Sequence, residues 1–541
     1  MIATEQPTPS ALPTDRAALL QRLAQPQTYD LLVIGGGATG LGVALDAAAR
    51  GFSVVLLESL DFAKGTSSRA TKLVHGGVRY LAQGNIGLVR EALHERTTLL
   101  HNAPHLAQPL AFVMPSYKWW ETPFYGAGLV AYDALAGRAG LGATQFLGRM
   151  QTLQCLPTVQ AEGLKGAVKY WDGQFDDARL ALALARSAAQ RGALLVNYCP
   201  VRELLHEGGK VSGAVCEDLE TGRRLTVRAR AVVNATGVWV DEVRALDAQA
   251  AGRTLKPMVA PSQGVHIVVD RDFLPSDHAL LVPKTADGRV LFAVPWLGKV
   301  ILGTTDSPRQ DHAREPQAFP EEVAFILGEA AKYLRRAPTA ADVRSIWVGL
   351  RPLVKPADDE GGNTKAISRE HTVLASASGL VTVTGGKWTT YRAMAEDVLQ
   401  KCMDERLLAQ RPAGITVDLP LVGAPSQPVR HRMCDAQGLH SYGSEADQVQ
   451  ALPGASQWLA PGLSEAMVRF AVRHEYARTV EDVLARRCRL LFLDARQAAQ
   501  LAPQVADILR SEGVQRPALA EFEALAQQYS HVPSPADAAT V

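Results

Sequence analysis

The sequence contains no run of about 18 apolar residues, so it predicts no membrane-spanning helix. Residues 1–28 lack the continuous apolar segment of a signal peptide, and we expect a mobile tail in which residues 16–23 could form a short helix. The six cysteines of the 541-residue chain are scattered, without a C-x-x-C pair. This disfavours a disulfide framework or a zinc site and fits a reducing compartment, and we predict no metal site. The formal net charge of +1 argues against a dedicated nucleic-acid binder, whose affinity would come from neutralising phosphates.

The most informative feature that is present is a glycine-rich turn near the N-terminus. Residues 31–34 predict a buried strand, and Gly35, Gly37 and Gly40 follow it in the spacing G-x-G-x-x-G. In that motif the first glycine allows a tight turn, the second lets the backbone approach a pyrophosphate, and the third lets the next helix pack closely on the strand. A second apolar strand ends at Glu58, 18 residues after Gly40, where a carboxylate can bind a ribose. The pattern predicts a dinucleotide site, and a strand–turn–helix unit without a ligand is the alternative.

The rest of the chain indicates further structural parts. Residues 177–191 predict a helix, and residues 194–197 and 231–240 predict buried strands, which is the alternation of a doubly wound sheet. Residues 258–305 are rich in strand formers and predict a separate antiparallel sheet that carries substrate specificity. Residues 411–455 are rich in Pro, Gly, Ser and Gln, as a linker would be, and the chain from residue 466 onward predicts helices. No chemistry is apparent in this last part, so we expect a packing or oligomerisation cap.

Residues 104–148 combine many aromatic residues with few charges. They include Trp119, Trp120, Phe124 and Tyr125. Because Trp and Tyr favour the headgroup region of a bilayer, this segment is a candidate interfacial surface. The alternative is that the aromatics pack a second domain, which is the interpretation that the sequence alone favours.

Several other motifs, in their order and approximate spacing, carry a resemblance to a known family. They are residues 66–80, which are dense in hydroxyl groups, glycines and cations, and residues 234–237, 303–306, 349–352, 367–369 and 385–392. On these motifs the chain resembles the FAD-dependent, quinone-linked glycerol-3-phosphate dehydrogenases. The match covers residues 29–400, and a weaker one covers residues 466–515.

The resemblance implies an α/β FAD-binding Rossmann-like fold with an inserted antiparallel β-sheet substrate domain and a C-terminal all-α domain. We then expect a tail at 1–28, an oxidoreductase domain at 29–405, a linker at 406–460 and a helical cap at 461–541. Within the oxidoreductase domain, discontinuous FAD-binding parts are expected near 29–110, 160–240 and 345–405, and the substrate-binding sheet near 255–345.

The resemblance also implies a reaction and partners. The reaction is the oxidation of sn-glycerol 3-phosphate to dihydroxyacetone phosphate, with electrons passing through FAD to ubiquinone or menaquinone. Family members are cytoplasmic, attach peripherally to the inner face of the cell membrane and tend to form homodimers. Some have a calcium-binding extension, but this sequence has no D-x-[DN]-x-[DN]-G loop, so calcium regulation is not expected.

Oxidising a secondary alcohol removes a hydride from carbon and a proton from oxygen, and a flavin accepts the hydride. The protein must therefore bind the phosphate, orient the alcohol and take the proton. Arginine forks and lysines bind phosphates best, so within the family motifs we assign substrate binding to Arg79, Tyr80, Arg351, Arg369 and Lys387. Alternatively, some of these cations neutralise the FAD pyrophosphate or form surface pairs.

The proton acceptor is the least defined role. The family places a histidine where this chain has His266, and a neutral imidazole could accept the alcohol proton. On the sequence alone, a single histidine on a strand is more often structural. Arg351 could stabilise a forming alkoxide, since an arginine stays charged and is a poor base. His75 is the alternative base, although its position beside Gly76 and Gly77 suggests close backbone contact with the isoalloxazine ring.

The resemblance also implies a set of FAD contacts. Gly35, Gly37 and Gly40 would meet the pyrophosphate, Glu58 the adenosine ribose and Val201 the adenine. The ribityl-phosphate would lie along Thr66, Ser67 and Ser68. The remaining predicted contacts are Ala38, Thr39, Lys72, Leu73, His75, Gly76, Gly77, Ala235, Thr236, Gly237, Gly386, Lys387 and Thr389.

Three other functions stay open at this stage. A glycerol-3-phosphate oxidase has the same fold and passes its electrons to oxygen. An amino- or hydroxy-acid oxidase would need a carboxylate-binding arginine instead of a phosphate cluster. A flavin-binding sensor would have no turnover. The chain has a single G-x-G-x-x-G, which disfavours flavin reductases with a second nucleotide domain.

Overall fold

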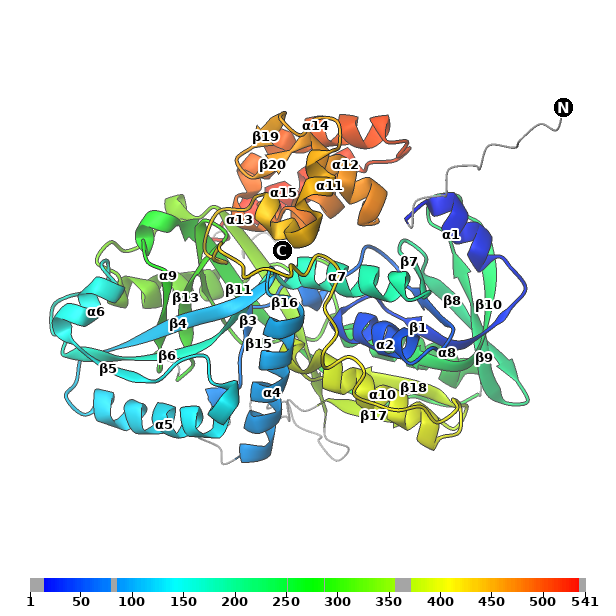
Figure 1. The fold of residues 1–541 in the computed structure, drawn as a ribbon, viewed down its shortest axis with the longest axis horizontal. Helices are drawn as coiled ribbons and strands as arrows, with labels where there is room; N and C mark the ends of the chain where they lie inside the picture. Colours follow the sequence, from blue (N-terminus) through cyan, green and yellow to red (C-terminus); the bar gives the residue numbers. More distant parts are fainter. Residues whose placement is uncertain (1–13, 79–84, 251, 287, 356–370, 535–541) are drawn as a thin grey trace.

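The computed structural model describes residues 14–78, 85–250, 252–286, 288–355 and 371–534. These residues form two large β-sheets and a helical C-terminal domain, which lies over the junction between the sheets (Figure 1). This is the predicted α/β architecture with a second sheet and an all-α C-terminal part.

The first sheet is centred on β1 (Thr28–Ile34), which pairs in parallel with β10 (Arg224–Asn234) and β2 (Val54–Leu57). The strand order is β17-β18-β10-β1-β2-β7, and the hairpin of β8 and β9 extends from β10. The other strands are β7 (Leu194–Val196), β8 (Val201–Glu207), β9 (Lys210–Glu217), β17 (Thr372–Ala375) and β18 (Leu380–Thr384).

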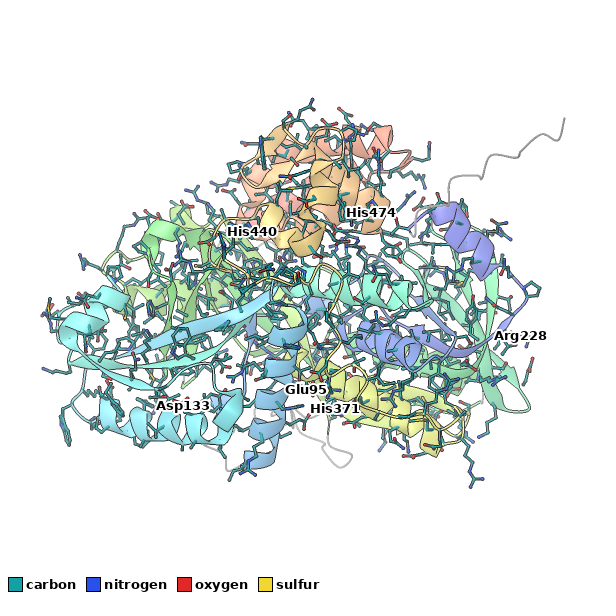
Figure 2. All side chains as sticks on the ribbon, viewed as in Figure 1. Glu95, Asp133, Arg228, His371, His440 and His474 are labelled. Atoms are coloured by element: carbon teal, nitrogen blue, oxygen red, sulfur yellow. The ribbon has the colours of Figure 1, made fainter. Side chains whose placement is uncertain are left out.

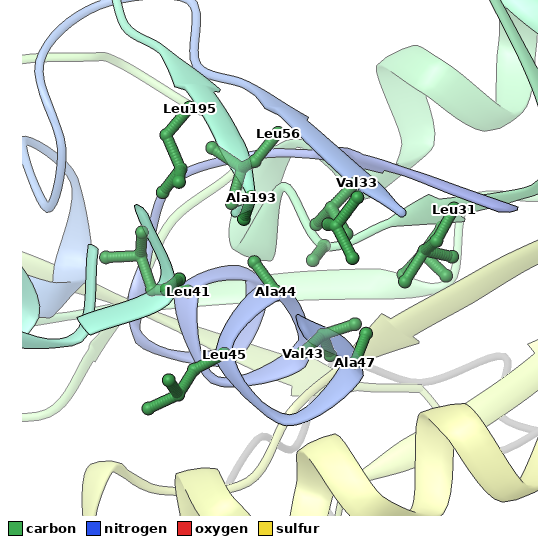
Figure 3. Close-up of a cluster of buried hydrophobic side chains, with 14 of the residues drawn as sticks. Leu31, Val33, Leu41, Val43, Ala44, Leu45, Ala47, Leu56, Ala193 and Leu195 are labelled. Carbon is green, nitrogen blue, oxygen red and sulfur yellow. The ribbon is translucent and has the colours of Figure 1, made fainter. Parts of the chain in front are cut away.

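Helices α2 (Ala38–Ala49), α7 (Asp177–Gln190) and α10 (Tyr391–Asp404) cover this sheet. Figure 3 shows the core beneath α2, where Leu41 and Ala44 face Leu31, Val33 and Leu56 of the central strands. A strand that is buried on both faces needs apolar residues at successive positions, which explains the continuous apolar run in β1.

The second sheet has the strand order β15-β11-β14-β13-β12-β4-β6-β3, with β16 paired to β11 and β5 to β6. The central strands are β11 (Val259–Asp270), β12 (His278–Val282), β13 (Leu291–Trp296) and β14 (Lys299–Gly303). The rest are β3 (Leu73–Val74), β4 (Ala107–Ser116), β5 (Gln145–Gly148), β6 (Gly166–Phe175), β15 (Ser307–Pro308) and β16 (Ser345–Val354). The sheet therefore draws on more of the chain than the predicted 255–345, and pairs β4 with β12 in parallel.

Strand β11 is buried on both of its faces. Val265, Ile267 and Val269 belong to a core that they share with α9 (Pro320–Tyr333). Val268 and the neighbouring Trp347 of β16 belong to a core that they share with the C-terminal helices. The two-residue period of a strand thus directs alternate side chains of β11 towards two different domains.

The C-terminal domain contains α12 (Glu465–His474), a π-helical turn at Asp482–Arg487, α13 (Leu490–Leu493), α14 (Ala495–Ser511) and α15 (Leu519–Ser530). In Figure 2, His474 marks the end of α12 above the first sheet. The segment predicted as a linker at 406–460 needs a correction. Its Leu408 and Leu421 pack into the first core, and Tyr442 and Val449 pack into the second, so it is part of the folded body.

The described part of the predicted N-terminal tail is also packed. Helix α1 (Arg16–Leu23) buries Leu19 and Leu23 against the first core. The Arg16 guanidinium donates to the Asn197 carbonyl at 2.6 Å and pairs with Asp218. The predicted helix at 16–23 is confirmed, and residues 14–28 are held to the first domain.

Helix α4 (Ile86–Asn102) contacts the helical turn Trp388–Thr390, which directly precedes α10. A buried ion pair also joins α4 to α10. Glu95 of α4, labelled in Figure 2, accepts from Arg392 of α10 at 2.5 and 3.0 Å. Both side chains are buried. Arg392 also pairs with Glu396 of the same helix at 2.7 Å, so removing Glu95 leaves the buried guanidinium with that one, partly exposed counter-charge.

We predict that Glu95→Gln lowers the free energy of unfolding by about 2 kcal/mol, because the buried Arg392 loses its hydrogen bonds to the Glu95 carboxylate and keeps only Glu396 as a counter-charge. The control is Glu203→Gln, which removes an exposed pair with Arg224 and is expected to cost less than about 1 kcal/mol. Urea unfolding followed by tryptophan fluorescence measures both. Equal losses in the two variants would contradict the structural role of the Glu95–Arg392 pair.

Candidate functional site

A cavity of about 1560 Å³ runs along the junction of the two sheets. On one side it is lined by the carboxyl ends of the parallel strands β1, β2 and β18 and by the turn that follows β10. On the other side it is lined by β11, β16, β4 and β6 of the second sheet. Ligands of doubly wound sheets bind at this position, outside the carboxyl ends of the strands.

The glycine turn forms one end of this cavity. Gly35 has a φ of +109°, and a Cβ there would come within 2.7 Å of the Ala235 carbonyl oxygen. Gly37 is the N-cap residue of α2 and has no side chain that could cap this helix. The helix therefore presents backbone N–H groups and its positive dipole end to the cavity, as an anion site requires.

Gly40 has a different role from the predicted pyrophosphate contact. A Cβ at this position would lie 2.0 Å from the Gly35 carbonyl oxygen, so only glycine lets α2 approach the turn. Gly40 lies behind the turn, whereas Gly35, Gly37, Ala38 and Thr39 line the cavity. The third glycine of the motif thus supports helix–strand packing.

Glu58 lies at the end of β2 and lines the cavity beside the turn. Its carboxylate accepts hydrogen bonds from the Gly36 N–H at 2.6 Å and the Leu60 N–H at 2.9 Å. Two carboxylate oxygens have about four acceptor positions, so this carboxylate can also accept from a ribose hydroxyl. The glycine turn, the N-terminus of α2 and the Glu58 carboxylate together fit the dinucleotide part of FAD.

The segment after Glu58 divides into residues that face the cavity and residues that face the protein interior. Thr66, Ser67, Leu73, His75 and Gly77 line the cavity. Ser67 also accepts from the Ala38 N–H at 2.9 Å, which joins this segment to the start of α2. Val201, Ala235, Thr236, Gly237, Gly386, Lys387 and Thr389 line other parts of the same cavity.

Three predicted cofactor contacts lie behind this wall and need a correction. The Lys72 ammonium points into the interior, where it donates to Asp177 at 2.7 Å. The Gly76 N–H donates to the Tyr132 hydroxyl at 2.9 Å, and a Cβ on Gly76 would clash with that hydroxyl at 2.3 Å. Ser68 is buried, and its carbonyl accepts from Lys72.

His266 lies on β11 and lines the cavity, although 98% of its surface is covered. Its Nε2 is 2.9 Å from the Thr71 hydroxyl, and its ring stacks on Trp347 with a centroid distance of 4.1 Å. Burial, together with the positive charges of Lys72 and Arg351, holds the pKa of His266 well below its usual range. The imidazole is therefore neutral near pH 7 and has a lone pair available for a proton.

Arg351 lies on β16, and Gly264 on the adjacent strand β11 leaves room for its guanidinium. A Cβ on Gly264 would lie 2.4 Å from Arg351 Nη2. The guanidinium donates to Asp306 at 3.1 Å and to the Thr305 carbonyl at 2.9 Å. These contacts fix the orientation of a cation that lines the same cavity as His266.

The predicted substrate residues Arg79, Tyr80 and Arg369 lie outside the described residues. Lys387 is described and lines the cavity at the start of the turn that leads into α10. The structure thus brings Arg351, Lys387 and His266 to one cavity.

Some residues that line the cavity were not among the site residues predicted from the sequence. Thr71 lies inside the segment 66–80, but only the fold shows that its hydroxyl meets His266. Five further cations line the cavity beside Arg351 and Lys387, namely Lys64, Arg69, Arg202, Arg289 and Arg314. The acidic residues on the wall are Glu58, Asp172, Glu242 and Asp306, so cations predominate and the cavity favours an anionic ligand.

The cavity also has an apolar arm, which the sequence did not indicate. It lies between α5 (Glu121–Ala136) and the strands β4, β6, β12 and β13, and is lined by Phe112, Met114, Phe124, Tyr125, Leu129, Tyr170, Leu281 and Phe292. Phe124 both lines this arm and is 66% exposed at the molecular surface. The arm therefore connects the His266 region with the surface of α5.

Comparisons with known proteins agree with this geometry. Residues 30–392 match the family model described as FAD dependent oxidoreductase, and residues 414–514 match the one described as C-terminal domain of alpha-glycerophosphate oxidase. The mitochondrial glycerol-3-phosphate dehydrogenase of Rattus norvegicus is 42% identical over 92% of this chain and 72% of its own length. The Arabidopsis thaliana mitochondrial enzyme of the same name is 39% identical over 93% of this chain and 86% of its own.

A solved structure gives the same result for the fold. The glycerol-3-phosphate dehydrogenase from Bacillus halodurans, complexed with FAD, is 30% identical and has a TM-score of 0.75. The alignment covers 96% of this chain and 99% of that one.

We predict that Gly40→Ala abolishes flavin binding, because the added methyl group would push α2 away from the Gly35 carbonyl. The visible absorbance of the purified protein, relative to its absorbance at the protein band, measures flavin content. Gly87→Ala is the matched control: Gly87 lies in α4 with nothing within 4 Å of a Cβ, so this variant keeps its flavin. A yellow Gly40→Ala protein with full flavin content would contradict the role given to this turn.

Proposed function

The chain belongs to the family of FAD-dependent glycerol-3-phosphate dehydrogenases, and we propose that it oxidises sn-glycerol 3-phosphate to dihydroxyacetone phosphate and passes the electrons to a membrane quinone. The observation that carries this proposal is a single cavity. It joins a dinucleotide turn at Gly35 and Gly37 to a buried His266 and an oriented Arg351. Bound FAD supplies the hydride acceptor, and the chain's own residues bind and orient the substrate and take its proton.

Arg351 is the best-supported contact for the substrate phosphate or for negative charge that develops on the reacting oxygen. Asp306 and two backbone carbonyls hold its guanidinium, so little side-chain entropy is lost on binding. Lys387 would bind the phosphate as a point charge. Arg79, Tyr80 and Arg369 remain predicted substrate contacts on the family pattern.

His266 is proposed as the proton acceptor, with Nε2 as the accepting atom. The Thr71 hydroxyl lines the cavity and already forms a hydrogen bond with this nitrogen. A substrate hydroxyl that approached the same atom would meet a neutral imidazole, because burial and two nearby cations disfavour the imidazolium. The lowered pKa means that the acceptor stays available in mildly acidic solution.

The apolar arm supports a quinone as electron acceptor. Its walls are mainly apolar and aromatic, as a site for a hydrophobic ring needs. The residues of the arm on α5 line the same cavity as His266, so an acceptor bound there would share the cavity with the substrate. Whether it is ubiquinone or menaquinone, the same chemistry would recognise it.

The surface of α5 supports peripheral attachment to a membrane. Trp119, Trp120 and Phe124 are 82%, 40% and 66% exposed, and Phe146 beside them is 54% exposed. We call these four residues the aromatic patch. Among the described residues no helix has the length and apolar character to cross a bilayer. We propose that this patch contacts the membrane interface, at the inner face of the cell membrane, and a homodimer stays a prediction.

The second candidate function is a glycerol-3-phosphate oxidase. The observation in its favour is the match of residues 414–514 to a domain described from alpha-glycerophosphate oxidase. The two functions differ in the acceptor. With glycerol 3-phosphate and a soluble quinone analogue, the proposed dehydrogenase reduces the quinone and forms little peroxide in air. Stoichiometric peroxide with no quinone reduction would instead establish the oxidase.

We predict that Arg351→Met lowers kcat/KM for glycerol 3-phosphate by about 100-fold, since a hydrogen bond to a charged group contributes up to about 3 kcal/mol. Quinone-analogue reduction at varied substrate concentration measures the loss. The control is Arg224→Met, which removes an exposed arginine of β10 and leaves kcat/KM unchanged. Wild-type kcat/KM in Arg351→Met would remove this residue from the site.

We also predict that the triple variant Trp119→Ala, Trp120→Ala and Phe124→Ala sediments with liposomes at least about 10-fold more weakly than the wild type, because it loses most of the aromatic patch. Trp458→Ala is the control, since Trp458 is 55% exposed but lies in the C-terminal domain. Liposome binding that is unchanged in the triple variant and lost in Trp458→Ala would transfer the membrane contact to the C-terminal domain.

A further inference from the structure

One arginine of the C-terminal domain reaches the back of the cavity wall. Arg489 precedes α13 and is fully buried. Its Nη2 donates to the Ser68 carbonyl at 2.8 Å and to Asp177 Oδ1 at 3.1 Å. It therefore contacts the segment that lines the cavity without lining the cavity itself.

Lys72 shares both of these acceptors with Arg489. Its Nζ donates to the Ser68 carbonyl and to Asp177 Oδ2, each at 2.7 Å. Asp177 Oδ2 also accepts from the Ala70 N–H at 3.1 Å. The Asp177 carboxylate thus accepts from the backbone of Ala70 and from the side chain of Lys72, both in the turn at 68–72. Arg489 of the C-terminal domain donates to the same carboxylate.

The backbone conformation of this turn requires stabilising contacts. Lys72 has a φ of 65°, in the left-handed region that is energetically unfavourable for non-glycine residues. The ammonium bonds to Ser68 and Asp177 offset that cost. Thr71 lies between the anchored residues Ala70 and Lys72, so the position of its hydroxyl depends on them.

Two contacts connect this arrangement to His266. The first is the hydrogen bond between the Thr71 hydroxyl and His266 Nε2, at 2.9 Å. The second is Trp347, whose ring stacks on the imidazole with a centroid distance of 4.1 Å and also has the Lys72 ammonium 4.5 Å from its centroid. Phe492 of α13 packs on Trp347 with a centroid distance of 5.3 Å.

We propose that Lys72, Asp177 and Arg489 form a positioning triad that holds Thr71 and Trp347 against the His266 imidazole, so that the C-terminal domain completes the catalytic site. The proposal rests on the proposed role of His266 as proton acceptor. The three residues of the triad lie behind the cavity wall, so they act through Thr71 and Trp347 and are not themselves catalytic.

The triad also acts on His266 by its charge. The charged groups near the imidazole are Lys72 and Arg351, and those around the Lys72 ammonium are Asp176, Asp177 and Arg489. Burial lowers the pKa of Lys72 to about 7, so its ammonium is charged below that pH. In that range burial and the Lys72 charge lower the pKa of His266. Removing the Lys72 charge raises that pKa towards its usual range. Since the neutral imidazole is the proton acceptor, the rate then falls at a higher pH when the solution is acidified.

The test is the pH dependence of anaerobic flavin reduction by glycerol 3-phosphate, measured by stopped flow on the FAD-loaded protein. We expect Lys72→Met to move the acid limb of the rate upward by about one pH unit, as the loss of a nearby charge should. Arg489→Met should lower the rate at least about 10-fold because Thr71 loses its position. Arg489→Lys keeps a cation on Asp177 and should recover most of that rate.

The matched control is Glu475→Gln, which breaks the buried Arg179–Glu475 pair at the same domain interface. This variant lowers the melting temperature but keeps the wild-type pH profile. If Lys72→Met does not fold, the comparison of Arg489→Met with Arg489→Lys carries the test. A wild-type pH profile in Lys72→Met, or equal rates in the two Arg489 variants, would overturn the triad. A wild-type flavin that glycerol 3-phosphate fails to reduce would instead contradict the proposed function and the role of His266.

Discussion

Buried ion pairs at the meeting point of the three structural parts are the constraint on which the cavity depends. Asp61, in the loop that follows Glu58, accepts from Arg486 and Arg487 of the C-terminal domain, and all three side chains are buried. Asp177 at the start of α7 accepts from Lys72 and Arg489. Desolvating such charges costs several kcal/mol per ion, so each must keep its partners and geometry. The loops at 58–72, which form the cavity wall, are fixed from behind by the C-terminal domain.

This arrangement explains how a chain with almost no net charge can bind a polyanion. Positive charges gather on the cavity wall, while buried acids behind the wall neutralise Lys72, Arg486, Arg487 and Arg489. The field inside a cavity depends on such local placement, and the net charge of the whole protein says little about it. His266 lies where the substrate cations and the buried triad both act on it, and its neutral state follows from that position.

The first domain could be predicted from the sequence because a buried strand, a glycine turn and the helix after it are local features, and the family could be predicted from motifs spread over residues 66–392. Helix 16–23 was predicted for the same reason. The second sheet was predicted only in part, since β4, β6 and β16 come from distant segments and pair through long-range contacts. The linker interpretation of 406–460 was wrong, because a composition rich in Pro and Gly does not reveal that Leu421 and Tyr442 fill two different cores.

For single residues of the site as well, the sequence did not show which groups a side chain contacts. Lys72 lies in a motif full of cavity residues, but its partner Asp177 is 105 positions away, and only the fold shows that its side chain turns inward. The packing role of Gly40 followed from its place in the motif, and the structure adds how close the helix comes to the Gly35 carbonyl. Thr71 lies in the motif at 66–80, but only the fold shows that its hydroxyl meets His266. The apolar arm is lined by residues from strands far apart in the chain, which no local pattern brings together.

If one cavity holds both FAD and glycerol 3-phosphate, the substrate gives a hydride to the flavin and a proton to the protein. An anaerobic titration of the FAD-loaded protein with sn-glycerol 3-phosphate measures this directly. We expect each equivalent added to bleach one equivalent of flavin and to yield one equivalent of dihydroxyacetone phosphate. A flavin that stays oxidised in excess glycerol 3-phosphate, under conditions in which dithionite reduces it, would contradict this function.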